Sequence, residues 1–134
     1  MVVNMRKVYL KPKKCNLCGG YVIYTSNKII YGKEYGNGKM YYCTKCHAYV
    51  GTHKHEPWKA MGILSNYRMR ELRTECHEIF DKLWKDAENP IKERREKYKW
   101  LAGEMGIPLE ECHFGWFSEE ELEKALSILR RGNI

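Results

Sequence analysis

The chain has 134 residues, enough for one ordinary domain or a small module with a helical partner, and no apolar run is long enough to span a membrane. Lys and Arg number 24 against 17 Asp and Glu, so the net charge is +7. The basic excess is unevenly distributed: residues 1–57 contain 10 basic and two acidic residues, whereas residues 58–134 contain 14 basic and 15 acidic residues. A basic half favours a partner that carries phosphates, although lysines also keep small domains in solution.

The basic half carries two Cys-x-x-Cys pairs, Cys15 with Cys18 and Cys43 with Cys46. Two such pairs have the ligand spacing of a zinc ribbon, in which four thiolates surround one Zn²⁺. Four cysteines leave no open coordination position, so we expect the zinc to be structural. Two disulfides would require a secreted chain. The first four residues open no signal peptide, so we expect a reducing compartment, the cytoplasm.

Between and around these pairs, the sequence predicts short strands over residues 20–25, 28–31, 39–43 and 47–51, because β-branched and aromatic residues alternate with turn residues. The third of these strands delivers Cys43. Antiparallel strands that end in Cys-x-x-Cys turns are the layout of a zinc ribbon.

After about residue 58 the apolar residues recur at helical spacing. We predict helices over 66–86, 91–105 and 119–131, with Ser65 as a cap for the first and a Ser118 capping box for the last. The residues expected to face the core are Met69, Leu72, Cys76, Ile79, Phe80, Leu83, Tyr98, Leu101, Ala102, Met105, Leu122, Ala125, Leu126 and Leu129. Cys76 and the other remaining cysteine, Cys112, are expected to be buried structural thiols.

The predicted fold class is therefore α+β, with an N-terminal antiparallel Cys₄ zinc ribbon packed on a small three-helix C-terminal unit. The ribbon is placed at residues 1–57 and the helical unit at 58–134, and we expect the two to form one integrated domain.

The first helix also carries a polar face about 110° from its apolar face. Its residues are Arg70, Arg73, His77, Asp81 and Trp84. Such a face could bind phosphate or hold a partner, or it could be a solvated surface with an Asp81–His77 pair. His113, in an aromatic loop, could approach His77 and complete a second metal or catalytic cluster. We favour instead a histidine satisfied within the protein.

Several motifs together resemble an uncharacterised zinc-finger-containing domain family that occurs mostly in phage and prophage genomes. They are the two Cys-x-x-Cys pairs, Ala48-Tyr49-Val50-Gly51-Thr52-His53, Arg70-x-x-Arg73-x-x-x-His77-x-x-Phe80-Asp81-x-Leu83-Trp84, Tyr98-Lys99-Trp100-Leu101-Ala102 and Cys112-His113-Phe114-Gly115. The resemblance covers about residues 14–130. It implies that ribbon and helices form one unit and that the origin is phage-related, and it brings no established activity.

The function predicted from these features is sequence-tolerant binding of DNA or RNA through the basic ribbon. The lysines expected to contact phosphates are Lys11, Lys13, Lys14, Lys28, Lys33, Lys39 and Lys45. The tyrosines that could stack on unpaired bases are Tyr24, Tyr31, Tyr35 and Tyr42.

One alternative is a phage-type interaction protein that binds or inhibits a host protein, in the bacterial cytoplasm if the chain is phage-encoded. Another is a metal-dependent nuclease centred on His77, Asp81 and His113. Enzymatic activity is left open and is not favoured, because the sequence contains no recognised catalytic motif. No membrane partner is expected.

Overall fold

The computed structural model describes residues 10–132 of the chain, which divides into two compact units, residues 1–67 and 68–134. Each unit is described by itself below. Within residues 10–132, no helix has both the length and the apolar character needed to cross a membrane. The fold is α+β, with the sheet in the first unit and the long helices in the second.

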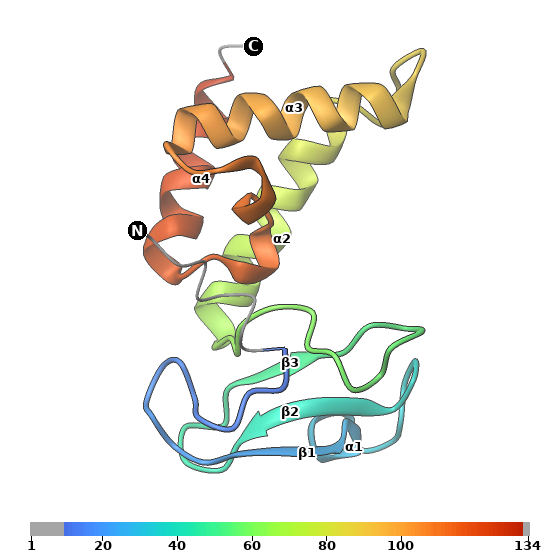
Figure 1. The fold of residues 1–134 in the computed structure, drawn as a ribbon, viewed down its shortest axis with the longest axis vertical. Helices are drawn as coiled ribbons and strands as arrows, with labels where there is room; N and C mark the ends of the chain where they lie inside the picture. The colour runs from blue at the N-terminus through green and yellow to red at the C-terminus, as the bar shows by residue number, and fades with distance from the viewer. Residues whose placement is uncertain (1–9, 133–134) are drawn as a thin grey trace. The chain divides into compact units, whose positions relative to one another are not determined.

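The first unit is built on a three-stranded antiparallel sheet (Figure 1). Its strands are β1 (Val22–Ser26), β2 (Lys39–Cys43) and β3 (Tyr49–Gly51), in the order β1-β2-β3. The β1–β2 register places Val22 opposite Cys43 and Ser26 opposite Lys39. The central strand therefore ends at a predicted metal ligand, as expected for a zinc ribbon.

The predicted strand over residues 28–31 is wrong, because this segment forms the short helix α1 (Lys28–Tyr31). Hydrogen bonds of the Asn27 side chain account for the helix in place of the predicted strand. Its amide nitrogen donates to the carbonyl of Tyr35 at 2.8 Å, and its amide oxygen accepts from the Tyr35 backbone N–H at 3.1 Å. The Asn27 backbone N–H also donates to the Gly38 carbonyl. These bonds close residues 27–38 into a compact loop, which overrides the strand propensity of the two isoleucines.

The core of the first unit is small and includes two of the cysteines. Its buried members are Cys15, Val22, Tyr41, Cys43, Ala48, Val50, Ala60 and Leu64. Asn16 ties the first Cys-x-x-Cys turn to this core, since its side chain accepts from the Leu64 N–H at 2.9 Å and donates to the Leu64 carbonyl at 3.0 Å. A core of this size is supported by few apolar groups, so a bound metal would contribute much of the unit's stability.

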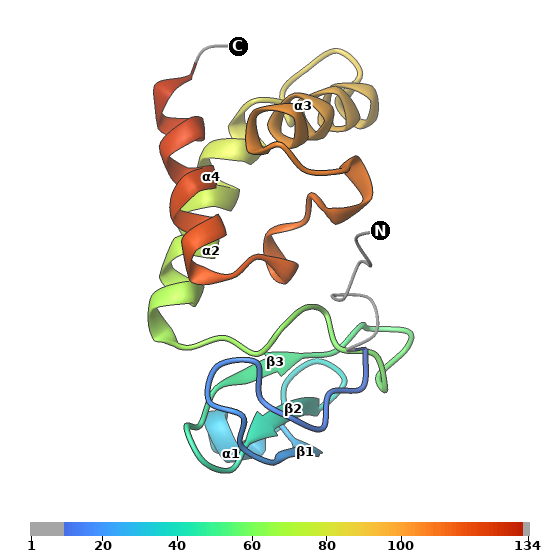
Figure 2. The same cartoon turned by 60° about the vertical axis from the view of Figure 1, so that its left-hand side comes forward.

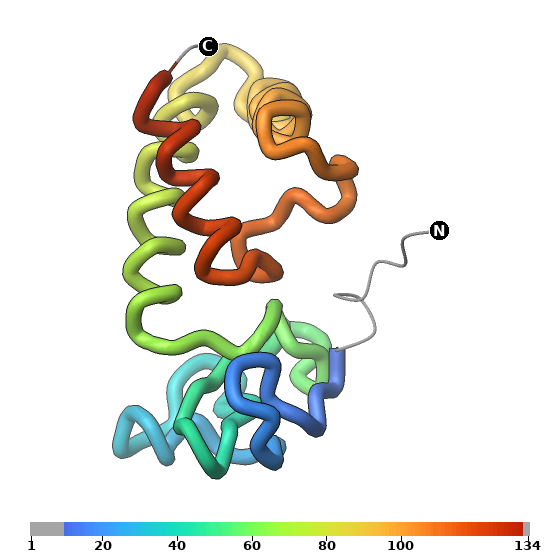
Figure 3. Tube along the Cα trace, turned by 90° about the vertical axis from the view of Figure 1, so that its left-hand side faces the viewer, coloured from blue at the N-terminus to red at the C-terminus, as the bar shows by residue number. Residues whose placement is uncertain are grey.

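The second unit contains three helices, α2 (Tyr67–Lys82), α3 (Pro90–Met105) and α4 (Glu119–Arg131). Helices α2 and α4 lie alongside each other and α3 crosses them (Figures 2 and 3). Two 3₁₀ turns, η2 (Leu109–Glu111) and η3 (Phe114–Trp116), form part of the connection from α3 to α4. The three predicted helices are thus present, although the first ends four residues earlier than predicted.

The helix caps agree with the sequence in one place and differ in another. The Ser118 hydroxyl accepts from the Glu121 N–H at 3.2 Å, and the Glu121 carboxylate accepts from the Ser118 N–H at 2.9 Å, which completes the predicted capping box. Ser65 instead forms a bridge to β3, where its hydroxyl donates to the Tyr49 carbonyl. Helix α2 then begins at Tyr67.

The core of the second unit follows the predicted apolar faces. Of the fourteen residues predicted to face it, all are buried except Ile79 and Leu83, which are half-buried. The ring centroid of Phe80 lies 4.4 Å from the ring centroid of Tyr98 and 5.6 Å from that of Phe114. Cys76 and Cys112 are buried in this core, and burial raises the pKa of their thiols to about 12 and about 11. Both are therefore protonated, as expected for structural thiols.

Candidate metal centre and basic surface

The two Cys-x-x-Cys turns of the first unit have the same backbone hydrogen bonds. In the first turn the N–H of Cys15 donates to the Gly20 carbonyl at 2.8 Å and its carbonyl accepts from Gly19 at 2.9 Å. In the second turn, the N–H of Cys43 donates to the Ala48 carbonyl at 2.8 Å, and the Cys43 carbonyl accepts from the His47 N–H at 3.1 Å. Each turn therefore presents its two sulfurs in the same way, although only the second follows a strand.

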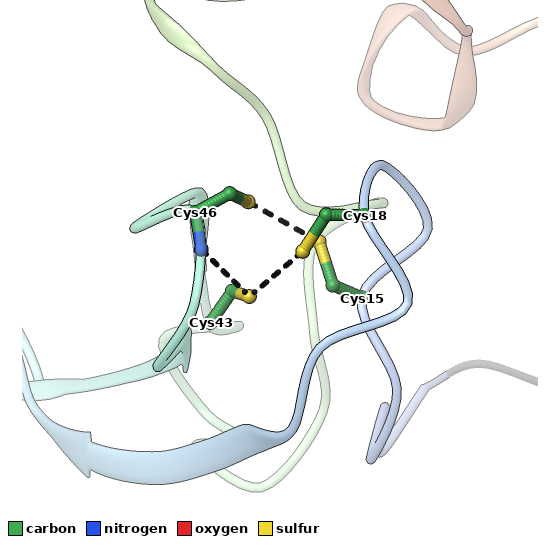
Figure 4. Close-up of side chains that lie close together, drawn as sticks. All are labelled: Cys15, Cys18, Cys43 and Cys46. Atoms are coloured by element: carbon green, nitrogen blue, oxygen red, sulfur yellow. Dashed lines mark hydrogen bonds between the residues drawn. The ribbon is translucent and has the colours of Figure 1, made fainter.

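The four sulfurs converge at one point between the turns (Figure 4). The Sγ atoms of Cys15 and Cys46 are 3.6 Å apart, those of Cys18 and Cys43 are 3.5 Å apart, and all four lie within 4.8 Å of one another. Zn–S bonds of about 2.3 Å place tetrahedral sulfurs about 3.8 Å apart. The donor set and its spacing therefore fit one metal ion of the zinc type.

Backbone amides are directed at these sulfurs. The N–H groups of Lys45 and Cys46 both donate to Cys43 Sγ at 3.4 Å, and that of Leu17 donates to Cys15 Sγ at 3.3 Å. Burial opposes ionisation of Cys43, but these amides and the neighbouring thiols outweigh it and lower its pKa to about 6. Cys46 is exposed as a residue, but desolvation of its thiol and the neighbouring sulfurs raise its pKa to about 12. A cation is needed to hold all four sulfurs as thiolates.

Gly20 permits the close approach of the two turns. A Cβ at this position would lie 2.7 Å from Lys45 Cβ, 3.0 Å from Cys43 Sγ and 3.1 Å from Cys18 Sγ. All three distances are shorter than ordinary contacts between heavy atoms. The glycine after the first Cys-x-x-Cys pair is thus required by the space around the metal centre.

His47 occupies the position that corresponds to Gly19 of the first turn. Gly19 has φ +75° and His47 has φ +69°, the only non-glycine residue with positive φ among those described. A side chain in this left-handed region usually costs stability. Here the His47 ring nitrogen Nδ1 is hydrogen-bonded to the Tyr42 hydroxyl, which supplies a local compensation.

The comparisons with known proteins agree with this geometry. A model of a zinc-finger-containing domain family matches residues 11–132. The chain belongs to this family. No match was found among curated proteins or among solved structures. Together, the family and the four clustered cysteines show a zinc-finger protein with a site for one metal ion.

The lysines predicted to contact phosphates are all exposed on the first unit. Residues 10–67 contain nine lysines and only two acids, Glu34 and Glu56. Both acids already have partners, because Glu34 accepts from the Ser26 hydroxyl at 2.6 Å and Glu56 lies 3.4 Å from Lys59 Nζ. Lys54, which was not among the predicted lysines, lines the same hollow as Lys39, because distant segments of the chain meet there.

These segments, residues 27–39 and 51–61, border a hollow of about 980 Å³ in the first unit. Its lining is formed by Asn27, Tyr31, Tyr35, Gly36, Asn37, Lys39, Gly51, Thr52, Lys54 and Met61. Two of the predicted stacking tyrosines, Tyr31 and Tyr35, are in this lining. Tyr24 lies outside it and donates through its hydroxyl to the Pro57 carbonyl at 2.9 Å.

The polar face of α2 is partly engaged within the second unit. The Arg73 guanidinium donates to the Gly115 carbonyl at 3.0 Å, and the His77 ring packs edge-on against Phe114 at 4.8 Å. Asp81 accepts from the Trp84 indole N–H at 3.2 Å. His77 is exposed overall, and the partial desolvation of its ring lowers its pKa; the Asp81 charge opposes this shift, while Arg94 and Arg73 add to it.

His77, Asp81 and His113 do not form a second metal centre. Within residues 10–132, the four cysteines are the only group of three or more His, Cys, Asp or Glu side chains whose ligand atoms could share one ion. The His113 ring instead lies 5.9 Å from that of Tyr98. The face therefore connects α2 to the aromatic loop.

Proposed function

We propose that this protein binds nucleic acid through the basic surface of its first unit, with one structural zinc held by Cys15, Cys18, Cys43 and Cys46. The single observation that carries the proposal is the charge of that unit: all seven lysines predicted for phosphate contact are exposed, while both acids have partners. A surface of one sign attracts phosphates from solution and binds them with little regard to sequence.

The zinc centre itself affects this charge. Four thiolates around Zn²⁺ carry a net charge of −2, so lysines close to the centre partly serve to balance it. Lys45 is one of them, since its Cβ lies against Gly20. Lys28, Lys33 and Lys39 belong to α1, the loop after it and the start of β2, away from the two turns. All three are exposed, and the ammonium groups of Lys33 and Lys39 lie over the rings of Tyr35 and Tyr24.

The choice of a control depends on the second unit. Arg94 is unsuitable because its guanidinium packs over the rings of Trp84 and Tyr98. Lys97 and Lys99 are better, because they are paired with Glu93 and Glu96 on the surface of α3. Changing these two together with the exposed Lys92 removes the same formal charge as changing Lys28, Lys33 and Lys39.

The test is a gel-shift titration at two salt concentrations with each triple lysine-to-glutamine variant. Loss of Lys28, Lys33 and Lys39 should lower affinity for long nucleic acid and reduce the slope of log affinity against log salt by up to about 3 for duplex DNA. The α3 variant should change little. Failure of the wild type to bind even at low salt, together with capture of a host protein that survives high salt, would replace this proposal with an interaction role.

A further inference from the structure

We infer that the hollow bordered by Tyr31 and Tyr35 takes unpaired bases, so that the preferred ligand is single-stranded nucleic acid. This inference rests on the proposed function and names its substrate class. It depends on three features of the hollow: exposed rings, two lysines with no carboxylate in the lining itself, and amide side chains that are already hydrogen-bonded within the protein.

The two rings meet edge to face, with centroids 5.5 Å apart and planes at 90°. In this arrangement the two ring faces point in different directions, and each side chain remains about half exposed, 49% for Tyr31 and 52% for Tyr35. Gly36, next to Tyr35, has open space where a side chain would begin. A flat base can therefore approach the backbone and lie against a ring. Stacking on aromatic side chains is the usual way in which proteins hold unpaired bases.

The charge around the rings suits a phosphodiester chain. Lys39 and Lys54 line the hollow, and Lys33 Nζ lies over one face of the Tyr35 ring, 5.3 Å from its centre. Among the described residues that line the hollow, none carries a carboxylate. A stacked base would thus bring its phosphates close to ammonium groups, while the nearby Glu34 carboxylate is held against Gly38 and bonded to the Ser26 hydroxyl.

The two asparagine side chains of the hollow are already hydrogen-bonded to other groups of the protein. Asn27 holds both backbone groups of Tyr35, and Asn37 donates to the Thr52 hydroxyl and to the His53 carbonyl, each at 2.9 Å. The Asn37 amide oxygen in turn accepts from the Lys39 N–H. These amides cannot also pair with base edges at full strength. The hollow therefore offers stacking and charge rather than a pattern that reads sequence.

The occupant must be unpaired for a geometric reason. Within a duplex, each base face is covered by its neighbours and only the edges are exposed in the grooves. Ring faces in a hollow can engage a base only when it is not stacked in this way. Double-stranded nucleic acid would still meet the lysines, but it would gain nothing from Tyr31 and Tyr35.

The experiment compares three fluorescently labelled probes of equal length on the full chain: an oligothymidylate, the same strand paired in a duplex, and an abasic phosphodiester strand. Anisotropy titrations would use the wild type, Tyr31→Ala, Tyr35→Ala, the matching Tyr→Phe variants, and Tyr21→Ala as a control. Tyr21 is 68% exposed and lies outside the hollow. Zinc content and circular dichroism would establish that each variant is folded.

The wild type should bind oligothymidylate more tightly than the abasic strand. Each Tyr→Ala change in the hollow should weaken oligothymidylate binding by roughly 5- to 100-fold, leave the abasic strand unaffected, and be rescued by phenylalanine. Tyr21→Ala should have no such effect. Equal affinity for all three probes, or loss of binding that is the same for the abasic strand, would overturn the inference and leave the proposed function intact. Absence of binding to every probe would remove both.

Discussion

Gly20→Ala is the sharpest test of the metal centre because it changes no ligand and no charge. The new methyl group would sit 2.7 Å from Lys45 Cβ, where ordinary carbon contacts are about 3.5–4.0 Å, so the two turns must separate by about 1 Å. Two of the atoms in its way are the metal-ligating sulfurs of Cys18 and Cys43. Overpacking of this kind costs about 1–3 kcal/mol. If the cost falls on the metal-bound form, zinc affinity should drop by roughly 5- to 150-fold.

The measurement is competition for zinc against a chromophoric chelator, on the full chain. Gly51→Ala is the matched control in the same unit, because its new methyl would meet only Met61 Sδ, at 3.9 Å. We expect Gly51→Ala to leave zinc affinity near the wild-type value. A Gly20→Ala variant with zinc affinity within about twofold of wild type would refute the argument that space around the sulfurs limits this turn.

Three further predictions concern other sites. Cys43→Ser should abolish stoichiometric zinc binding and unfold the first unit, which elemental analysis and circular dichroism would show; a variant that keeps one tightly held zinc would contradict the ligand set. Arg73→Ala should lower the free energy of unfolding by about 1–3 kcal/mol, since a charged donor to a backbone carbonyl is lost, whereas the exposed Arg95→Ala should cost less than about 0.5 kcal/mol in the same denaturant titration. The lowered pKa of His77 means that the folded state binds a proton less readily than the unfolded state, so stability should be full above the ordinary pKa of about 6.5 and fall slightly as pH drops below it. His77→Gln should flatten that part of the pH profile; an unchanged profile would show that the ring titrates normally.

The sequence was sufficient for features that depend on local spacing. Each Cys-x-x-Cys pair, each helix and the Ser118 capping box is defined by the spacing of residues within one short segment. The sequence was insufficient where contacts between residues far apart in the chain determine the local structure. The residues around Ile29 have strand propensity, but the bonds from Asn27 to Tyr35 turn them into a helix within a loop.

The hollow illustrates the same limit. Tyr31 and Tyr35 were recognisable as stacking candidates, yet their neighbours Lys54 and Met61 come from a segment some 20 residues further along the chain. Nothing in the composition of residues 51–61 indicates that they border these rings. The left-handed conformation of His47 was equally hidden, since only the comparison with the glycine of the first turn makes it expected.

A single strand links the metal centre to the proposed binding surface. β2 begins at Lys39, which lines the hollow, and ends at Cys43, which is a ligand; its register with β1 runs unbroken from Ser26–Lys39 to Val22–Cys43. Removal of the metal leaves several protonated or mutually repelling sulfurs at one end of this ladder. Because the unit has few other buried apolar groups, disorder there should extend along β2 to the rings. Nucleic-acid affinity should therefore fall on chelation and return with zinc, although none of the four cysteines is among the residues that line the hollow. If chelation left the nucleic-acid affinity unchanged, the metal would not be needed to maintain the proposed binding surface.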